Sequence, residues 1–168
     1  MAEPSLRTQT IALWNEHNPT LDTSPMEVVA QVKRISSLLE LAVERAYAGA
    51  MLTVAEVELL VPLRYADNPV TAIRLAELLG ISRAGVSKTL ANLEHRGMLS
   101  RTPNPADRRS ALIKLSDAGI RAVDDVFPRE LEAHAQLLAG LGKGRAKVLT
   151  ALNHLAETME SQLNRSAE

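Results

Sequence analysis

A polar segment in the second half of the chain carries the residues best suited to bind a charged partner. Two β-type runs, Leu99–Thr102 and Ala111–Leu115, flank a stretch with two prolines and the triplet Asp107, Arg108 and Arg109. Because such a stretch is difficult to bury, it predicts an exposed hairpin loop. Paired arginines at the tip of a narrow loop can enter a DNA minor groove, where the phosphates concentrate negative potential.

Asp107 is the one acidic residue of this tip, and its charge repels phosphate. We therefore expect it to brace the loop by holding an arginine in a charge-assisted pair. The alternative is that Asp107 only forms the turn.

Two short helices are predicted directly before the hairpin, over Thr71–Leu79 and Ser82–His95. Gly80 can adopt the left-handed backbone that ends the first, and the Ser82 hydroxyl can cap the second. Along the second helix Val86, Leu90 and Leu93 recur at steps of four and three, which indicates a buried side. The candidate DNA contacts lie on its polar, cationic side or are small residues that allow a close approach: Ser82, Arg83, Ala84, Gly85, Ser87, Lys88 and Asn92.

A helix with an apolar back and a small, cationic front has the features needed in a major groove. Each of these residues alone could equally be a solvated surface side chain. The set, followed by the arginine-tipped hairpin, favours double-stranded DNA as the partner. The charge distribution agrees, since residues 83–114 carry a net charge of +5 in a chain whose total is −1.

The remaining helices are predicted at both ends of the chain. One is expected over Ser5–His17, a second over Met26–Ala50, and a third from a Thr53 cap towards Tyr65 with Pro62 in its last turn. Ser116 is expected to cap a long helix that contains Pro128, and a last helix follows three glycines.

The terminal helices carry apolar stripes without an obvious partner, which favours a two-fold dimer interface over packing within one chain. The expected fold is mainly α with a small β-hairpin wing. Residues 1–50 and 117–168 would form a dimerisation lobe and residues 51–116 a winged helix-turn-helix lobe, within one integrated domain.

Composition excludes several classes of protein. The chain has no cysteine, so disulfides and thiolate metal sites are absent. No long apolar run or leader pattern occurs, so we expect a soluble, cytoplasmic protein without a membrane partner. Catalytic motifs are missing as well, and the histidines are scattered: His17, His95, His134 and His154. We expect neither an enzyme nor a bound metal or cofactor.

Several short motifs in order resemble the multiple antibiotic resistance regulator (MarR) family. The main ones are Leu75-Ala76-Glu77, Ile81-Ser82-Arg83, Asn104-Pro105-Ala106-Asp107-Arg108-Arg109 and Leu115-Ser116-Asp117-Ala118-Gly119. The resemblance spans about residues 26 to 163. It implies a winged-helix homodimer that binds a palindromic operator and that a small ligand or an oxidant releases from DNA.

The extra N-terminal helix with Trp14 resembles the urate-responsive branch of that family. In that branch a Trp, an Asp and two Arg form the effector site, and these positions correspond here to Trp14, Glu58, Thr89 and Arg101. Two of the four residues match, so the resemblance implies Trp14, Glu58 and Arg101 as a candidate effector pocket. It would bind an anionic or aromatic metabolite other than urate. Alternatively, Trp14 only packs its helix onto the core.

The sequence therefore predicts a ligand-responsive, DNA-binding transcriptional regulator that acts as a homodimeric repressor. A metal-responsive regulator of the same fold and a dimeric scaffold that does not bind DNA remain as alternatives.

Overall fold

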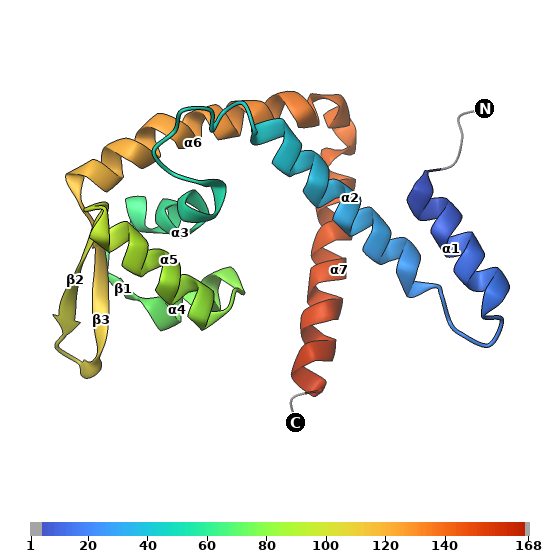
Figure 1. Cartoon of the computed structure of the whole chain (residues 1–168), viewed down its shortest axis with the longest axis horizontal. Helices are drawn as coiled ribbons and strands as arrows, with labels where there is room; N and C mark the ends of the chain where they lie inside the picture. The colour runs from blue at the N-terminus through green and yellow to red at the C-terminus, as the bar shows by residue number, and fades with distance from the viewer. Residues whose placement is uncertain (1–4, 167–168) are drawn as a thin grey trace. The chain divides into compact units, whose positions relative to one another are not determined.

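The computed structural model describes residues 5–166, which form seven α-helices, one 3-10 helix and three strands (Figure 1). The elements are α1 Leu6–His17, α2 Pro25–Val43, α3 Val54–Arg64, β1 Val70–Thr71, α4 Ala72–Leu79, α5 Arg83–His95, β2 Leu99–Asn104, β3 Asp107–Leu115, α6 Asp117–Leu138, η1 Ala139–Gly144 and α7 Arg145–Arg165. The expected fold, mainly α with a small hairpin wing, is confirmed.

The chain divides into two compact units. The first ends at His134 and contains α1 to β3 and most of α6, whereas the second starts at Ala135 and contains η1 and α7. Among residues 5–166 no helix has the length and apolarity that crossing a bilayer requires.

The hydrophobic core lies in the first unit, where α3, α4, α5 and the sheet meet. Leu60, Leu75, Leu90 and Leu93 have no measurable exposure, and Val86 is 1% exposed. The three α5 residues in this core are those whose spacing predicted a buried side. Burial of this side fixes which face of α5 remains in solvent.

The sheet is antiparallel with the strand order β1-β3-β2. Its long pair places Leu99 opposite Leu115 and Arg101 opposite Ile113, and the two-residue β1 pairs with the other edge of β3. Strand β1 was not predicted, because two residues are too few to show an alternating pattern. Both strands of the hairpin are longer than expected, so that only residues 105 and 106 form its turn.

Helix boundaries follow the predicted caps. Thr53 and Ser82 accept hydrogen bonds from backbone N–H groups in the first turns of α3 and α5, and Gly80 ends α4 with a φ of 65°. Ser116 donates its hydroxyl to Gly97 O and accepts the N–H of Gly119. A Cβ on Gly119 would lie 2.0 Å from the carbonyl oxygen of Met98, so the start of α6 requires glycine there.

The second helix ends earlier than the sequence predicted. It stops at Val43 instead of Ala50, and a series of turns with 2.9–3.3 Å hydrogen bonds leads into α3. The Tyr47 hydroxyl in these turns donates to Glu130 on α6, and burial together with this contact raises the pKa of Tyr47. This tertiary contact ends the helix where the apolar periodicity alone would have continued it.

Helix α3 is joined to two other helices by arginine–carboxylate pairs. At its end, Arg64 donates two hydrogen bonds of 2.7 and 2.8 Å to Asp124 of α6, and this pairing lowers the pKa of Asp124. At its start, Glu56 is 5% exposed and accepts a 2.5 Å hydrogen bond from Nη1 of Arg96, the residue after α5. The second pair places the end of α5 relative to the rest of the core.

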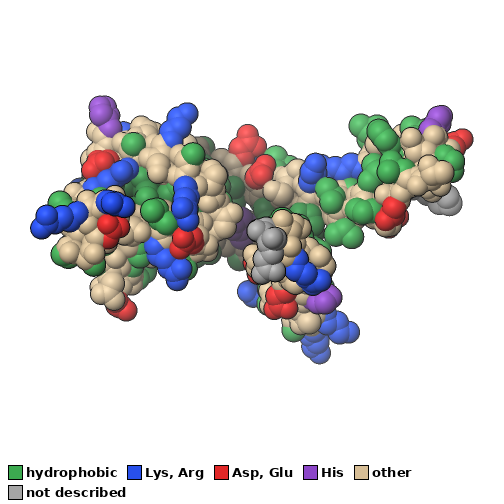
Figure 2. All heavy atoms as spheres, turned by 90° about the horizontal axis from the view of Figure 1, so that it is seen from below, with side chains coloured by type: hydrophobic (Ala, Val, Ile, Leu, Met, Phe, Trp, Pro, Cys, Tyr) green, Lys and Arg blue, Asp and Glu red, His purple; other side chains and the backbone are tan. Residues whose placement is uncertain are grey.

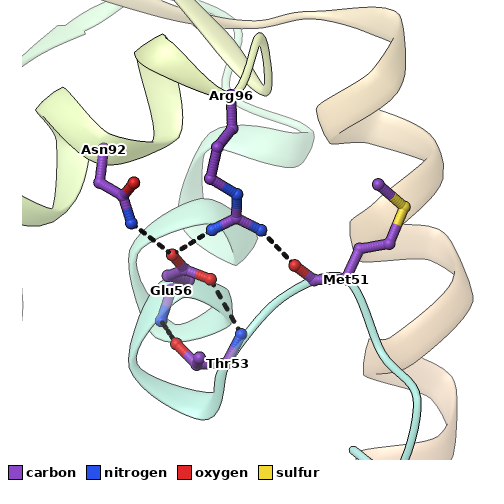
Figure 3. Close-up of polar contacts among 5 residues, drawn as sticks. All are labelled: Met51, Thr53, Glu56, Asn92 and Arg96. Atoms are coloured by element: carbon purple, nitrogen blue, oxygen red, sulfur yellow. Dashed lines mark hydrogen bonds and ion pairs between the residues drawn. The ribbon is translucent and has the colours of Figure 1, made fainter.

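Glu56 also satisfies its other oxygen (Figure 3). Its Oε2 accepts the N–H of Thr53 at 2.9 Å, the reciprocal half of a capping box, while Arg96 donates from Nη2 to the carbonyl of Met51. One carboxylate therefore ties together the loop before α3, the first turn of α3 and the end of α5.

Replacing Glu56 by Ala should destabilise the protein by about 3 kcal/mol, because it leaves Arg96 without its carboxylate and removes half of a capping box. Urea unfolding at a fixed protein concentration measures this change. Glu58→Ala, two residues along α3 at an exposed position without a hydrogen bond among the described residues, is the matched control and should change stability by under about 0.5 kcal/mol. Equal losses for the two variants would show that Glu56 is not an anchor.

Candidate nucleic-acid interface

The exposed face of α5 is built from the residues that the sequence analysis selected. Ser82, Arg83, Ala84, Gly85, Ser87 and Lys88 are all exposed, whereas Val86 between them is buried. The Ser82 hydroxyl accepts the N–H of Gly85 at 3.2 Å, which satisfies one of the free amides at the helix start. The first two turns of α5 thus present short side chains and two cations to solvent.

The two cations of this face differ in their surroundings. Nη2 of Arg83 lies 3.3 Å from Oε1 of Glu77 on α4, in an exposed ion pair that a stronger anion could replace. Lys88 is exposed and forms no ion pair with the described residues. Lys88 is the more available of the two for an incoming phosphate or base edge.

Asn92 lies differently from the other candidates on α5. Its Nδ2 points towards Glu56 of α3, at 3.5 Å from Oε1 (Figure 3). The Asn92 amide therefore contacts the same carboxylate as Arg96 at the end of α5, although Asn92 as a whole residue is exposed.

The tip of the hairpin is ordered by short polar contacts. The side chain of Asn104 accepts the N–H of Ala106 at 3.1 Å and donates to the hydroxyl of Ser110 at 2.9 Å. Ser110 in turn donates to the carbonyl oxygen of Asp107. These contacts stabilise the two-residue turn at residues 105 and 106 from the residues on either side of it.

Asp107 braces this tip through the backbone. Its carboxylate accepts the N–H of Arg109 at 3.0 Å and forms no ion pair with an arginine side chain of the described residues. The expected charge-assisted pair is therefore corrected to the alternative role, a turn former, because the carboxylate lies closest to the free amide two residues further on. Arg108 and Arg109 are both exposed.

Positive side chains stand out from this part of the molecule. In Figure 2 several Lys and Arg side chains, in blue, surround the winged-helix elements at the left of the view, with acidic side chains between them. The cations of α5 and of the hairpin tip belong to one compact unit, so a single duplex could meet both.

Arg101 lies at the base of the hairpin. Its Nε is 3.2 Å from Oε2 of Glu94 on α5, but the alignment falls short of a hydrogen bond, and Nε and Nη2 are buried without a hydrogen-bond partner. Arg101 thus links β2 to α5 by charge.

A cavity of about 490 Å³ lies in the first unit between α2, α3 and α6. It is lined by Ser36, Leu39, Glu40, Val43, Val54, Val57, Glu58, Val61, Pro62, Phe127, Glu130 and His134. Of the three candidate effector residues only Glu58 lies in this lining. Trp14 is 49% exposed on α1 and Arg101 lies at the hairpin base, so within one chain the three residues do not form one pocket.

The ion pair between Glu56 and Arg96, which anchors the end of α5, was not predicted from the sequence. A signal for half of it was present, because Thr53 followed three residues later by Glu56 is the pattern of a capping box. Nothing in the local pattern pairs Glu56 with Arg96, which lies 40 residues further along the chain. Among residues 5–166 no three His, Asp or Glu side chains are grouped so that they could hold a metal ion.

Comparison with known proteins agrees with this geometry. Residues 49–110 match the model of the MarR family. Over 141 residues the chain is 28% identical to the HTH-type transcriptional regulator PecS of Dickeya dadantii (strain 3937), which covers 83% of this chain and 85% of PecS.

Solved structures show the same fold. The transcriptional repressor CouR bound to a 23-mer DNA duplex matches with a TM-score of 0.67 and 25% identity, over 92% of this chain and 99% of that chain; CouR comes from Rhodococcus jostii RHA1. The regulator PcaV from Streptomyces coelicolor, in complex with its natural ligand, matches with a TM-score of 0.64 and 20% identity, over 94% of this chain and 98% of that chain. Residues 49–110 are thus similar to the MarR family of transcriptional regulators, and the chain shares the winged-helix fold of these solved structures.

Proposed function

We propose that the protein is a homodimeric repressor that reads its operator with α5 and the hairpin tip, and that a small ligand releases it. The proposal is supported by the exposed, cationic front of α5, whose end is joined to the buried Glu56 by Arg96. Arg108 and Arg109 follow in the same unit. Ser82, Arg83, Ala84, Gly85, Ser87 and Lys88 would meet the major groove. Asn92 would support them through Glu56.

The hairpin tip would enter the minor groove beside each half-site. Its two arginines are exposed, and the turn is held by Asp107 and Ser110, so little ordering would be needed on binding. Arg and Lys inserted into a narrow minor groove are favoured by its negative potential.

Dimerisation would use the terminal helices, that is, residues 1–50 and 117–168. Val28, Val32 and Ile35 on α2 are 41–49% exposed, and Leu149 and Leu152 on α7 are 43–51% exposed. Hydrophobic side chains, in green, cover much of the part of the chain at the right of Figure 2. Helix faces with several exposed apolar side chains are uncommon on a monomer, and a two-fold interface would bury them.

The ligand response would arise in the cavity between α2, α3 and α6. The cavity touches α2, which belongs to the proposed dimerisation lobe, and α3, which carries the Glu56 anchor of α5. A ligand that binds better to one spacing of the two α5 helices would shift the dimer to that spacing. We assign no catalytic role, and we place the protein in the cytoplasm, where the DNA would be.

Arg109→Ala should weaken binding to all duplexes, because the lost contact is to phosphate and minor-groove potential. The slope of the logarithm of the association constant against the logarithm of the salt concentration should become shallower by about one unit for each Arg109 contact that is lost. Titrations by fluorescence anisotropy at several salt concentrations measure this slope. Arg145→Ala on α7 is the matched control and should leave it unchanged. An unaltered slope for Arg109→Ala would remove the hairpin from the DNA interface.

Lys88→Ala should change the preference between sequences. If Lys88 reads a base edge, the ratio of affinities for operator and scrambled duplex should fall by about tenfold. Competition gel shifts measure that ratio, with Lys147→Ala on α7 as the control. An unchanged ratio and unchanged affinity would show that α5 does not read the operator.

A further inference from the structure

The lining of the cavity between α2, α3 and α6 is one-sided in charge. Three carboxylates, Glu40, Glu58 and Glu130, line it together with His134, and neither Lys nor Arg is among its lining residues. Its other walls are mainly aliphatic, with Phe127 as the aromatic member. The volume of about 490 Å³ lies within the range of small-molecule sites in proteins.

No Lys or Arg among residues 5–166 forms an ion pair with these carboxylates. Glu40 accepts a hydrogen bond of 3.1 Å from the hydroxyl of Ser36, and Glu130 accepts one from Tyr47. Nδ1 of His134 lies 3.9 Å from Glu130, beyond hydrogen-bond distance. Glu58 forms no hydrogen bond or ion pair with any residue in the range 5–166.

From this lining we infer that the cavity binds a small organic cation with an apolar body. The carboxylates attract a positive head group, and Phe127 places an aromatic ring in the lining, the kind of side chain that attracts cations. The aliphatic walls fit the apolar part of the same molecule. An anion would instead meet three like charges, of which Glu130 is half-buried and Glu40 and Glu58 are exposed.

This inference rests on the proposed ligand response and deepens it by naming the class of ligand. It also replaces the anionic effector expected from the sequence, because that expectation relied on Arg101. The lining contains Glu58 but lacks Arg101. An aromatic body remains compatible with the cavity, whereas a carboxylate group does not.

The test uses three probes of one shape on the full-length protein: 1-naphthylmethylammonium, 1-naphthalenemethanol and 1-naphthoate. Isothermal titration calorimetry at pH 7 without DNA measures each dissociation constant. The ammonium should bind at least about tenfold more tightly than the naphthoate, with the neutral alcohol between them.

Two variants assign this preference to the cavity. Glu58→Gln should weaken binding of the ammonium by about fivefold and leave the alcohol within about twofold, since only the charge is lost. Glu157→Gln on α7, an exposed acidic residue outside the lining, should change neither. Thermal unfolding of both variants checks that each retains the fold.

Equal or tighter binding of naphthoate would overturn the inference, and so would a lack of ammonium binding at millimolar concentration. A Glu58→Gln variant that binds the ammonium as the unmodified protein does would overturn it too. Gel shifts with operator DNA on the same preparations keep the proposed function separate. Retained DNA binding with a preference for the anion would contradict only the ligand class, whereas absent DNA binding would contradict the proposed function itself.

Discussion

The burial of one charged group helps to fix where α5 ends relative to α3. Moving a carboxylate out of water is costly unless its oxygens are paired, and Glu56 is 5% exposed. Arg96 and the N–H of Thr53 satisfy it, and the same arginine also reaches Met51. Any shift of α5 relative to α3 would leave Glu56 or Arg96 without its partner. The apolar core buries the back of α5, while this pair joins the end of α5 to the start of α3.

The orientation of α5 has a direct consequence for recognition. Leu90 and Leu93 hold the back of α5 in the core, so the opposite side, with Arg83 and Lys88, must face solvent. A few hydrogen bonds around Asp107 then order the hairpin tip, and its arginines remain free of ion pairs with the described residues. The surface that we propose for DNA binding is thus assembled before DNA is present, which would lower the entropic cost of association.

Local chemistry in the sequence predicted much of this architecture, and long-range contacts account for what it missed. The caps at Thr53 and Ser82 depend on neighbours within three residues, and both are present as predicted. The early end of α2 depends on Tyr47 meeting Glu130, 83 residues away, and no periodicity reveals such a contact. The same limit applies to the site, since Glu56 resembles a surface residue until Arg96 is placed beside it. For Asp107 we expected an ion pair with an arginine side chain, whereas the structure shows a hydrogen bond from the N–H of Arg109, two residues further on.

In the proposed complex, a pair of α5 helices and a pair of hairpin tips contact one operator. Hydroxyl-radical and methylation-interference footprints on the promoter region upstream of the gene test it most directly. We expect two major-groove contact zones related by a two-fold axis, with centres separated by about 10 bp or a multiple of it. Each zone should be flanked by minor-groove protection that Arg109→Ala removes. A single zone without symmetry, or flanking protection that persists in the Arg109→Ala variant, would contradict it.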